Sequence, residues 1–262
     1  MGSGGAYPNG VGGGTVTADG DWVANAVNSE GSITGTVSLD STYFAKMSVA
    51  SGSSDYTITL PAASGNGGKM LAIRFTNTGM TTVDGNSLET ISGELTRYYM
   101  EGDMAWFYCD GSNYYVQQSL RPVGARAYRA TAQTSVSSVA KIQLDTETYD
   151  HNGDFDSSTN YDFTAPATGY YHIQGSAYFV TPPADMLMTL YIYVNGSSVT
   201  ATGMEEDGGA TATYNQGLTL GDVYRVTKGQ KIDLRASRSS SGNIAGGANS
   251  TFISIRRLED NF

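Results

Sequence analysis

The chain has 262 residues, enough for one large or two modest domains with a buried core. Only 15% of the residues are charged, and the abundance of glycine (33) and tyrosine (18) favours short strands and turns over helices. The net charge of −10 and the lack of a Lys/Arg cluster exclude nucleic acid as an expected partner, because phosphate backbones would be repelled. No segment approaches the roughly 18 apolar residues that cross a membrane, so no membrane is expected as a partner either.

Residues 1–20 are rich in glycine and lack both the basic start and the apolar stretch of a signal peptide. Tyr7 and Val11 are almost their only apolar anchors. Such a segment is not expected to fold alone and would gain order only on docking. We therefore interpret it as a flexible attachment arm.

Residues 21–118 are predicted to form a β-rich module. The segments 56–60 and 69–75 alternate apolar with polar residues, the pattern of half-buried strands. Segment 19–30 has room for one or two helical turns.

Two further strands are predicted at 105–109 and 114–118. The Asp-Gly-Ser-Asn sequence at 110–113 joins them and predicts a hairpin. Cys109 ends the first of these strands and is the single cysteine, so no intrachain disulfide can form. Its apolar neighbours predict a buried, inert thiol.

Residues 119–125 are the predicted linker, because Pro122 and Gly124 interrupt the alternation there. Residues 126–262 then carry strand after strand. Asn195-Gly196 is a strong hairpin signal, and Lys228-Gly229 marks a second turn. Strands at this spacing without helical periodicity predict an antiparallel sandwich of the jelly-roll kind.

The sequence FTAPATGYYHIQG, residues 163–175, predicts a corner that leads into one of these strands. Pro166 fixes its own φ and biases the preceding residue towards extended geometry. Gly169 is expected to adopt a backbone angle that a side chain would penalise. After this corner Tyr171 and every second residue up to Phe179 are predicted to face the core.

This half of the chain resembles the superfamily of tumour-necrosis-factor-like and complement globular-head jelly rolls, over residues 126–258. Its hallmark is an acidic, Asn-containing segment followed by Phe-Thr-x-Pro-x-x-Gly-x-Tyr, which Phe163, Pro166, Gly169 and Tyr171 match. Gln230 stands where the family has an acidic residue after Lys-Gly. The closing strand of the family is matched from Phe252. The resemblance implies a jelly roll that associates as a homotrimer.

The first module resembles a recurring unit of bacteriophage tail and head fibres. The shared marks are Ile-Thr-Leu-Pro at 58–61, Gly-Lys at 68–69, Thr-Ile-x-Gly at 90–93 and Asp-Gly-x-Asn at 110–113. The order of arm, fibre-like module and jelly roll implies a bacteriophage fibre.

One acidic stretch has the oxygen spacing of a calcium loop, with Asp150, Asn152, Asp154 and Asp156 at alternate positions. Phe155 and Tyr161, however, stand where an EF-hand needs glycine and glutamate. We therefore favour the interpretation that these side chains cap turns, and we predict no metal site.

No catalytic or cofactor-binding residue is predicted either. His151 and His172 show no triad or metal-ligand spacing. The acidic run within 204–209 is interpreted as an exposed loop tip, because neighbouring strand residues point apart. Carboxylate pairs suited to glycoside cleavage remain an open alternative in a chain this acidic.

Tyr191 and Tyr193 lie on the strand face opposite Leu190, Ile192 and Val194, so both faces of this strand are apolar. A monomeric sandwich would expose one polar face. The tyrosines therefore indicate either a subunit interface, which we favour, or a platform on which sugars stack.

The sequence thus predicts an all-β, non-enzymatic, homotrimeric bacteriophage fibre or appendage located in the virion. The arm would bind capsid or tail proteins. The jelly roll would bind a host surface glycan or protein through predicted loops at 145–162, 201–216 and 237–250. The alternatives are a tailspike-type glycan-cleaving enzyme and a cellular surface adhesin. The residues predicted to shape the fold or the trimer are Phe163, Pro166, Gly169, Tyr171, Tyr191, Tyr193 and Phe252.

Overall fold

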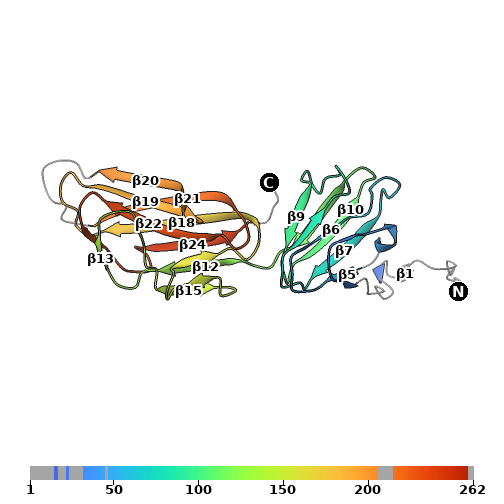
Figure 1. Ribbon diagram of the computed structural model, residues 1–262, viewed down its shortest axis with the longest axis horizontal. Coiled ribbons are helices and arrows are strands. Elements are labelled where there is room, and N and C mark those ends of the chain that lie inside the picture. Colours follow the sequence, from blue (N-terminus) through green and yellow to red (C-terminus); the bar gives the residue numbers. More distant parts are fainter. Residues whose placement is uncertain (1–14, 17–21, 24–31, 45–46, 206–214, 259–262) are drawn as a thin grey trace. The chain divides into compact units, whose positions relative to one another are not determined.

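The computed structural model describes residues 15–16, 22–23, 32–44, 47–205 and 215–258 (Figure 1). Its contacts divide the chain into two compact units, Met1–Arg121 and Pro122–Phe262. In the described part the structure is almost entirely β, which confirms the predicted fold class. The one helical element there is a 3-10 turn, Ser41–Tyr43, whose start is capped by the Asp40 carboxylate (2.8 Å from Thr42 N).

Most of the predicted arm and much of the predicted helical segment 19–30 lie outside the described residues. Two short strands are described there, β1 (Thr15–Val16) and β2 (Trp22–Val23), and they pair with each other. Within the described part of the chain, no helix is long and apolar enough to span a membrane.

Unit 1 consists of two further sheets. The first has the order β11-β10-β7-β5-β3 and the second the order β4-β6-β8-β9. Their strands are β3 (Ser32–Ile33), β4 (Val37–Ser38), β5 (Met47–Ala50), β6 (Tyr56–Thr59), β7 (Met70–Phe75), β8 (Thr81–Asp84), β9 (Thr96–Tyr99), β10 (Met104–Cys109) and β11 (Tyr114–Ser119).

From β3 to β8, successive strands belong alternately to the first and the second sheet. Each strand from β5 to β8 pairs in parallel with the strand two before it in the chain. Ile33, Ala50 and Phe75 are cross-strand neighbours in the first sheet and are all buried. The antiparallel strands β9, β10 and β11 follow. This coiled arrangement was not predicted, because alternation within a strand does not reveal the partner of that strand.

The predicted buried faces of unit 1 are confirmed. Ile58 and Leu60, and likewise Leu71, Ile73 and Phe75, belong to one buried cluster together with Cys109. The predicted hairpin is also confirmed, since β10 and β11 pair from Cys109 and Tyr114 outwards.

Unit 2 is an antiparallel jelly-roll sandwich. One sheet has the order β13-β23-β18-β24-β12-β15, with β21 also paired to β18, and the other has the order β16-β17-β22-β19-β20, with β14 paired to β22. The strands of the first sheet are β12 (Gly124–Tyr128), β13 (Gln133–Val136), β15 (Thr146–Asp150), β18 (Gly169–Phe179), β21 (Gln216–Val226), β23 (Gly242–Ile244) and β24 (Phe252–Arg257). Those of the second are β14 (Ala140–Lys141), β16 (Phe155–Asp156), β17 (Asp162–Thr164), β19 (Leu187–Val194), β20 (Ser197–Glu205) and β22 (Lys231–Arg238).

The core of unit 2 lies between these two sheets. Tyr171, Ile173, Ala177 and Phe179 of β18 are fully buried, as the alternation predicts. On the other side of β18, Ser176 is also buried, and its hydroxyl is satisfied by donating to Ser250 O (2.9 Å).

Both predicted turns of unit 2 form. Asn195 and Gly196 have positive φ values of 49° and 82° and join β19 to β20 as a hairpin. The turn at Lys228-Gly229 instead connects strands of different sheets, since β21 pairs with β18 and β22 pairs with β19.

The three predicted loops are shorter than expected. Segment 145–162 contains β15 and β16, and segment 237–250 contains β23. Segment 201–216 begins inside β20, and much of its remainder lies outside the described residues. The predicted linker 119–125 likewise holds the last residue of β11 and the first two of β12.

Candidate functional site

The corner at 163–171 packs against the turn between β21 and β22. Ala165 N donates to Gln230 O (2.9 Å), and Gly229 N donates to Ala165 O (2.8 Å). The Tyr171 hydroxyl donates to Ala167 O (2.7 Å), and its ring contacts the buried Phe163 ring edge-on, with centroids 6.0 Å apart. The corner therefore joins the two sheets of unit 2.

Gln230, which replaces the acidic residue of the resembled family, helps to close that turn. Its side-chain oxygen accepts a hydrogen bond from Thr227 N (2.9 Å), and Gly229 has a φ of 82°. An amide oxygen thus provides the acceptor that a carboxylate would provide.

The expectation for the backbone of Gly169 was wrong. Gly169 does not have a positive φ. It is the first residue of β18, where it pairs with Val226 of β21. Its lack of a side chain matters for another reason: a Cβ there would lie 3.1 Å from the Nε of the buried Arg257. Close approach of a neighbouring side chain, rather than turn geometry, explains the glycine.

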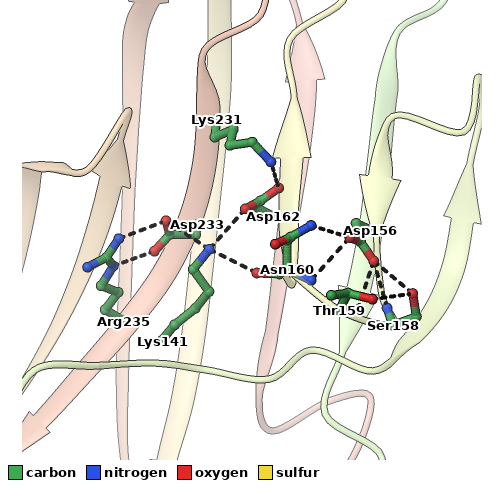
Figure 2. Close-up of polar contacts among 9 residues, drawn as sticks. All are labelled: Lys141, Asp156, Ser158, Thr159, Asn160, Asp162, Lys231, Asp233 and Arg235. Carbon is green, nitrogen blue, oxygen red and sulfur yellow. Dashed lines mark hydrogen bonds and ion pairs between the residues drawn. The ribbon is translucent and has the colours of Figure 1, made fainter.

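The acidic stretch 150–156 forms turns, as we favoured. The Asp150 carboxylate accepts hydrogen bonds from the backbone N–H groups of Asn152, Gly153 and Phe155 (2.8–3.2 Å). The Asp156 carboxylate accepts from the segment 158–160, both from backbone and from side chains (Figure 2). These hydrogen bonds hold the pKa of Asp156 well below its ordinary value.

An ion-pair network covers the outward side of β14, β17 and β22. Lys141 Nζ lies between two buried carboxylates, 3.0 Å from Asp162 Oδ2 and 3.4 Å from Asp233 Oδ2 (Figure 2). Lys231 Nζ contacts the other oxygen of Asp162 (2.8 Å). Arg235 makes two hydrogen bonds with Asp233 (2.6 and 3.1 Å), which raise the pKa of its guanidinium. Both carboxylates are thus neutralised by cations, an arrangement suited to fixing strands rather than to proton transfer.

Tyr191 and Tyr193 lie on the same outward side, on β19. Their rings meet edge-on at 6.0 Å, and the Arg235 guanidinium stacks over Tyr193 at 4.0 Å. The Tyr191 hydroxyl lies 3.3 Å from Ser237 Oγ. Both tyrosines are half-buried, so contacts within the chain already cover part of their apolar area. Their place in a subunit interface stays a prediction.

The outward side of the other sheet carries exposed apolar side chains among polar ones such as Gln174 and Arg256. Tyr170 and Tyr178 on β18 are each 37% exposed, and Val223 of β21, opposite His172, is 45% exposed. Phe252 lies on the same side, opposite Ser176, with the Arg126 guanidinium over its ring (4.4 Å). Alternation in the sequence places the even-numbered β18 residues away from the core, but it does not predict that they form one surface with residues of β21 and β24. Tyr170, Val223 and Phe252 lie on three strands that are far apart in the sequence, so no single segment indicates that they share a surface.

The described residues hold no group of three or more His, Cys, Asp or Glu side chains arranged to bind a metal ion. His151 and His172 are both exposed, and His151 contacts the Tyr149 ring (5.1 Å). Of the acidic run within 204–209, only Met204 and Glu205 at the end of β20 lie in the described part.

Comparison with known proteins finds structural likeness alone. No family model matches the chain, and no curated protein sequence does. The Eiger TNF of S. frugiperda is similar with a TM-score of 0.45 and 12% identity, over 54% of this chain and 96% of that one. The globular domain of the zebrafish complement 1qA protein (TM-score 0.40, 15% identity, 54% and 100% coverage) and murine APRIL at pH 8.5 (0.41, 10%, 53% and 100%) are also similar.

Proposed function

We propose that this chain is a non-enzymatic structural protein of a bacteriophage virion, a homotrimeric fibre or appendage whose jelly roll binds the host surface. The observation that carries the homotrimer is the exposed side of the β21-β18-β24 sheet, with Tyr170, Tyr178, Val223 and Phe252. The free face of an antiparallel sheet in a monomer is ordinarily polar. Tyrosine combines apolar area with a hydroxyl and is enriched in interfaces.

The local structure supports a flat contact surface here. Gly217 lies opposite Tyr178, and a Cβ at Gly217 would come within 2.9 Å of the Tyr178 ring. The ring therefore lies across the bare backbone of β21. A tyrosine held in this way loses little side-chain entropy when a second subunit covers it.

Residues 1–20 would dock on the capsid or tail, unit 1 would act as a spacer, and unit 2 would contact a host glycan or protein. Three linked copies would add avidity, so that weak single contacts with a repetitive surface polymer could hold a particle. The resemblance of the first module to phage fibre units supports a virion location. The neutralised carboxylates Asp162 and Asp233 support binding rather than catalysis.

The homotrimer is tested by light scattering of the purified chain. We expect a mass close to 83 kDa, three times 27.7 kDa, and no change with reductant because the only cysteine, Cys109, is buried. The double substitution Tyr178→Lys and Val223→Lys should lower the mass towards that of one chain. Val139→Lys is the matched control, since Val139 is 44% exposed between β13 and β14 and lies outside both tyrosine surfaces. A monomer at micromolar concentration contradicts the proposal.

The virion role is tested by binding. The full chain should bind host cells and should join particles only when residues 1–20 are present. Release of reducing sugar ends from host polysaccharide would identify a glycan-cleaving enzyme instead. Binding to host cells without any incorporation into virions would favour a cellular adhesin.

A further inference from the structure

Unit 1 also has an apolar sheet face directed to solvent, on the outward side of β5, β7, β10 and β11. Three of its side chains are strongly exposed: Met70 (49%), Tyr108 (47%) and Tyr115 (57%). Their strand neighbours in β7 and β11, Leu71 and Tyr114, point inward and are buried, as alternation requires. We call this surface the Met–Tyr face, and it consists of Met47, Val49, Met70, Met104, Trp106, Tyr108 and Tyr115.

Strand register aligns these side chains into rows. Tyr108 of β10 lies directly between Met70 of β7 and Tyr115 of β11. In the next row, Trp106 lies between Ala72 and Gln117, and Ala72 is only 7% exposed. Directly opposed side chains on one sheet face contact each other. The Met–Tyr face is therefore one continuous surface and not a set of scattered apolar residues.

The composition of this face is that of a protein–protein contact. Interface centres are enriched in Tyr, Trp, Met and Arg and depleted in Asp, Glu and Lys. None of the outward positions of β5, β7, β10 and β11 in the described structure holds an acidic residue, and Arg74 is the charged residue among them. This absence stands out in a chain with 25 acidic residues and a net charge of −10.

We infer that the Met–Tyr face contacts unit 1 of a second copy of this chain, within the homotrimer proposed above, on which this inference rests. Two copies that each carry −10 repel one another, and a face without carboxylates is where that repulsion is weakest. Two apolar faces can also pack against each other without complementary charges on the two copies.

The exposed area of the Met–Tyr face suits a contact that adds to a larger interface elsewhere in the homotrimer. Each strongly exposed side chain offers on the order of 100 Å², about half of what a large side chain buries. The total is well below the roughly 800 Å² per partner of a stable interface. Such a contact forms when the copies are already held together, because tethering raises their effective concentration.

The test places a photo-activated benzophenone amino acid at Gln117, an exposed residue in the row beside Tyr115, in the full-length chain. Irradiation of the homotrimer should yield a chain-to-chain adduct. The double substitution Met70→Lys and Tyr115→Lys should reduce that adduct about tenfold, because two ammonium groups would oppose each other across the contact. Leu88→Lys is the control: Leu88 is 83% exposed in unit 1 but lies outside this face, and the adduct should persist.

The outcomes separate this inference from the proposed trimer. A trimer by light scattering that gives no adduct from position 117 overturns the inference and leaves the trimer intact, with the Met–Tyr face open to another partner. A monomeric chain overturns both. An adduct that survives in the Met70→Lys, Tyr115→Lys chain also contradicts the inference, because the contact would then not depend on the face.

Discussion

Gly175 lies in the middle of β18, on the side that faces the opposite sheet of unit 2. A Cβ at this position would lie 2.4 Å from Cδ1 of the buried Leu234 in β22. The alternation in the sequence correctly places Gly175 towards the core, but it does not reveal what the glycine meets there. The missing side chain lets the two sheets approach, and Leu234 fills the space.

We predict that Gly175→Ala destabilises the chain by about 1–3 kcal/mol, the usual cost of adding a methyl group to a packed core. Gly221→Ala is the control, because Gly221 lies on the adjacent strand β21 and its Cβ would make only a 3.4 Å contact with Ile173 O. Urea unfolding at one fixed protein concentration measures both. Equal stability of the two variants would show that the sheets are not closely packed at Gly175.

At the scale of elements, turns in unit 2 are closed by side chains as much as by backbone. Asp150 and Asp156 each accept several N–H groups, and Gln230 closes the turn that supports the corner. The sequence predicted turn caps at the first two, because aspartate commonly caps turns and the stretch lacks the glycine and glutamate of an EF-hand. The contribution of Gln230 was missed, because glutamine is not a typical turn residue.

Asp156 should make stability depend on pH. Its carboxyl pKa is depressed in the folded chain, chiefly by the backbone N–H groups of Thr159 and Ser158. Its stabilising contribution is therefore complete above the ordinary pKa of about 4 and is lost as the pH falls below it. Asp156→Asn should lower the melting temperature at pH 7, and the difference from the parent should shrink below about pH 4.

The control for Asp156 is Asp185→Asn, which removes the same charge from an exposed carboxylate. That variant should melt like the parent across the pH range. A difference for Asp156→Asn that stays constant down to pH 2 would contradict the role of its ionised form.

At the scale of the whole molecule, the chain separates cleanly between Arg121 and Pro122. Arg121 N donates to Asp103 Oδ1 (2.6 Å) within unit 1, whereas Pro122 O accepts from Asn152 Nδ2 (3.2 Å) within unit 2. The sequence instead predicts a jelly roll that starts at Arg126, which lies inside β12. That start would remove Gly124 and Ala125, which pair with Arg256 and Ile255 of β24.

A fragment 122–262 should therefore unfold at a higher urea concentration than a fragment 126–262. The shorter fragment loses ladder hydrogen bonds of β12 and the buried Val123 and Ala125 side chains. Burying two small apolar side chains contributes about 2 kcal/mol or more, so the difference should be easily measured. If both fragments unfold at the same concentration, the first residues of β12 do not stabilise unit 2.

The sequence by itself determined which segments are strands, which of their sides face the core, and where two hairpins turn. These properties are local: they follow from period-two alternation and from turn residues such as Asn195-Gly196 and the sequence at 110–113. The burial of Cys109 followed in the same way from its apolar neighbours. The corner at 163–171 was recognised from its motif, although Gly169 serves a purpose other than the one expected.

Only the tertiary structure decided which strands pair. The parallel coil of β3 to β8, the assignment of β21 and β22 to different sheets, and the Lys141–Asp162–Asp233 network all join residues far apart in the chain. Alternation specifies the inward side of a strand but not its neighbours. Exposed surfaces such as the Met–Tyr face exist only once register aligns residues from several strands, and so no single segment of the sequence contains them.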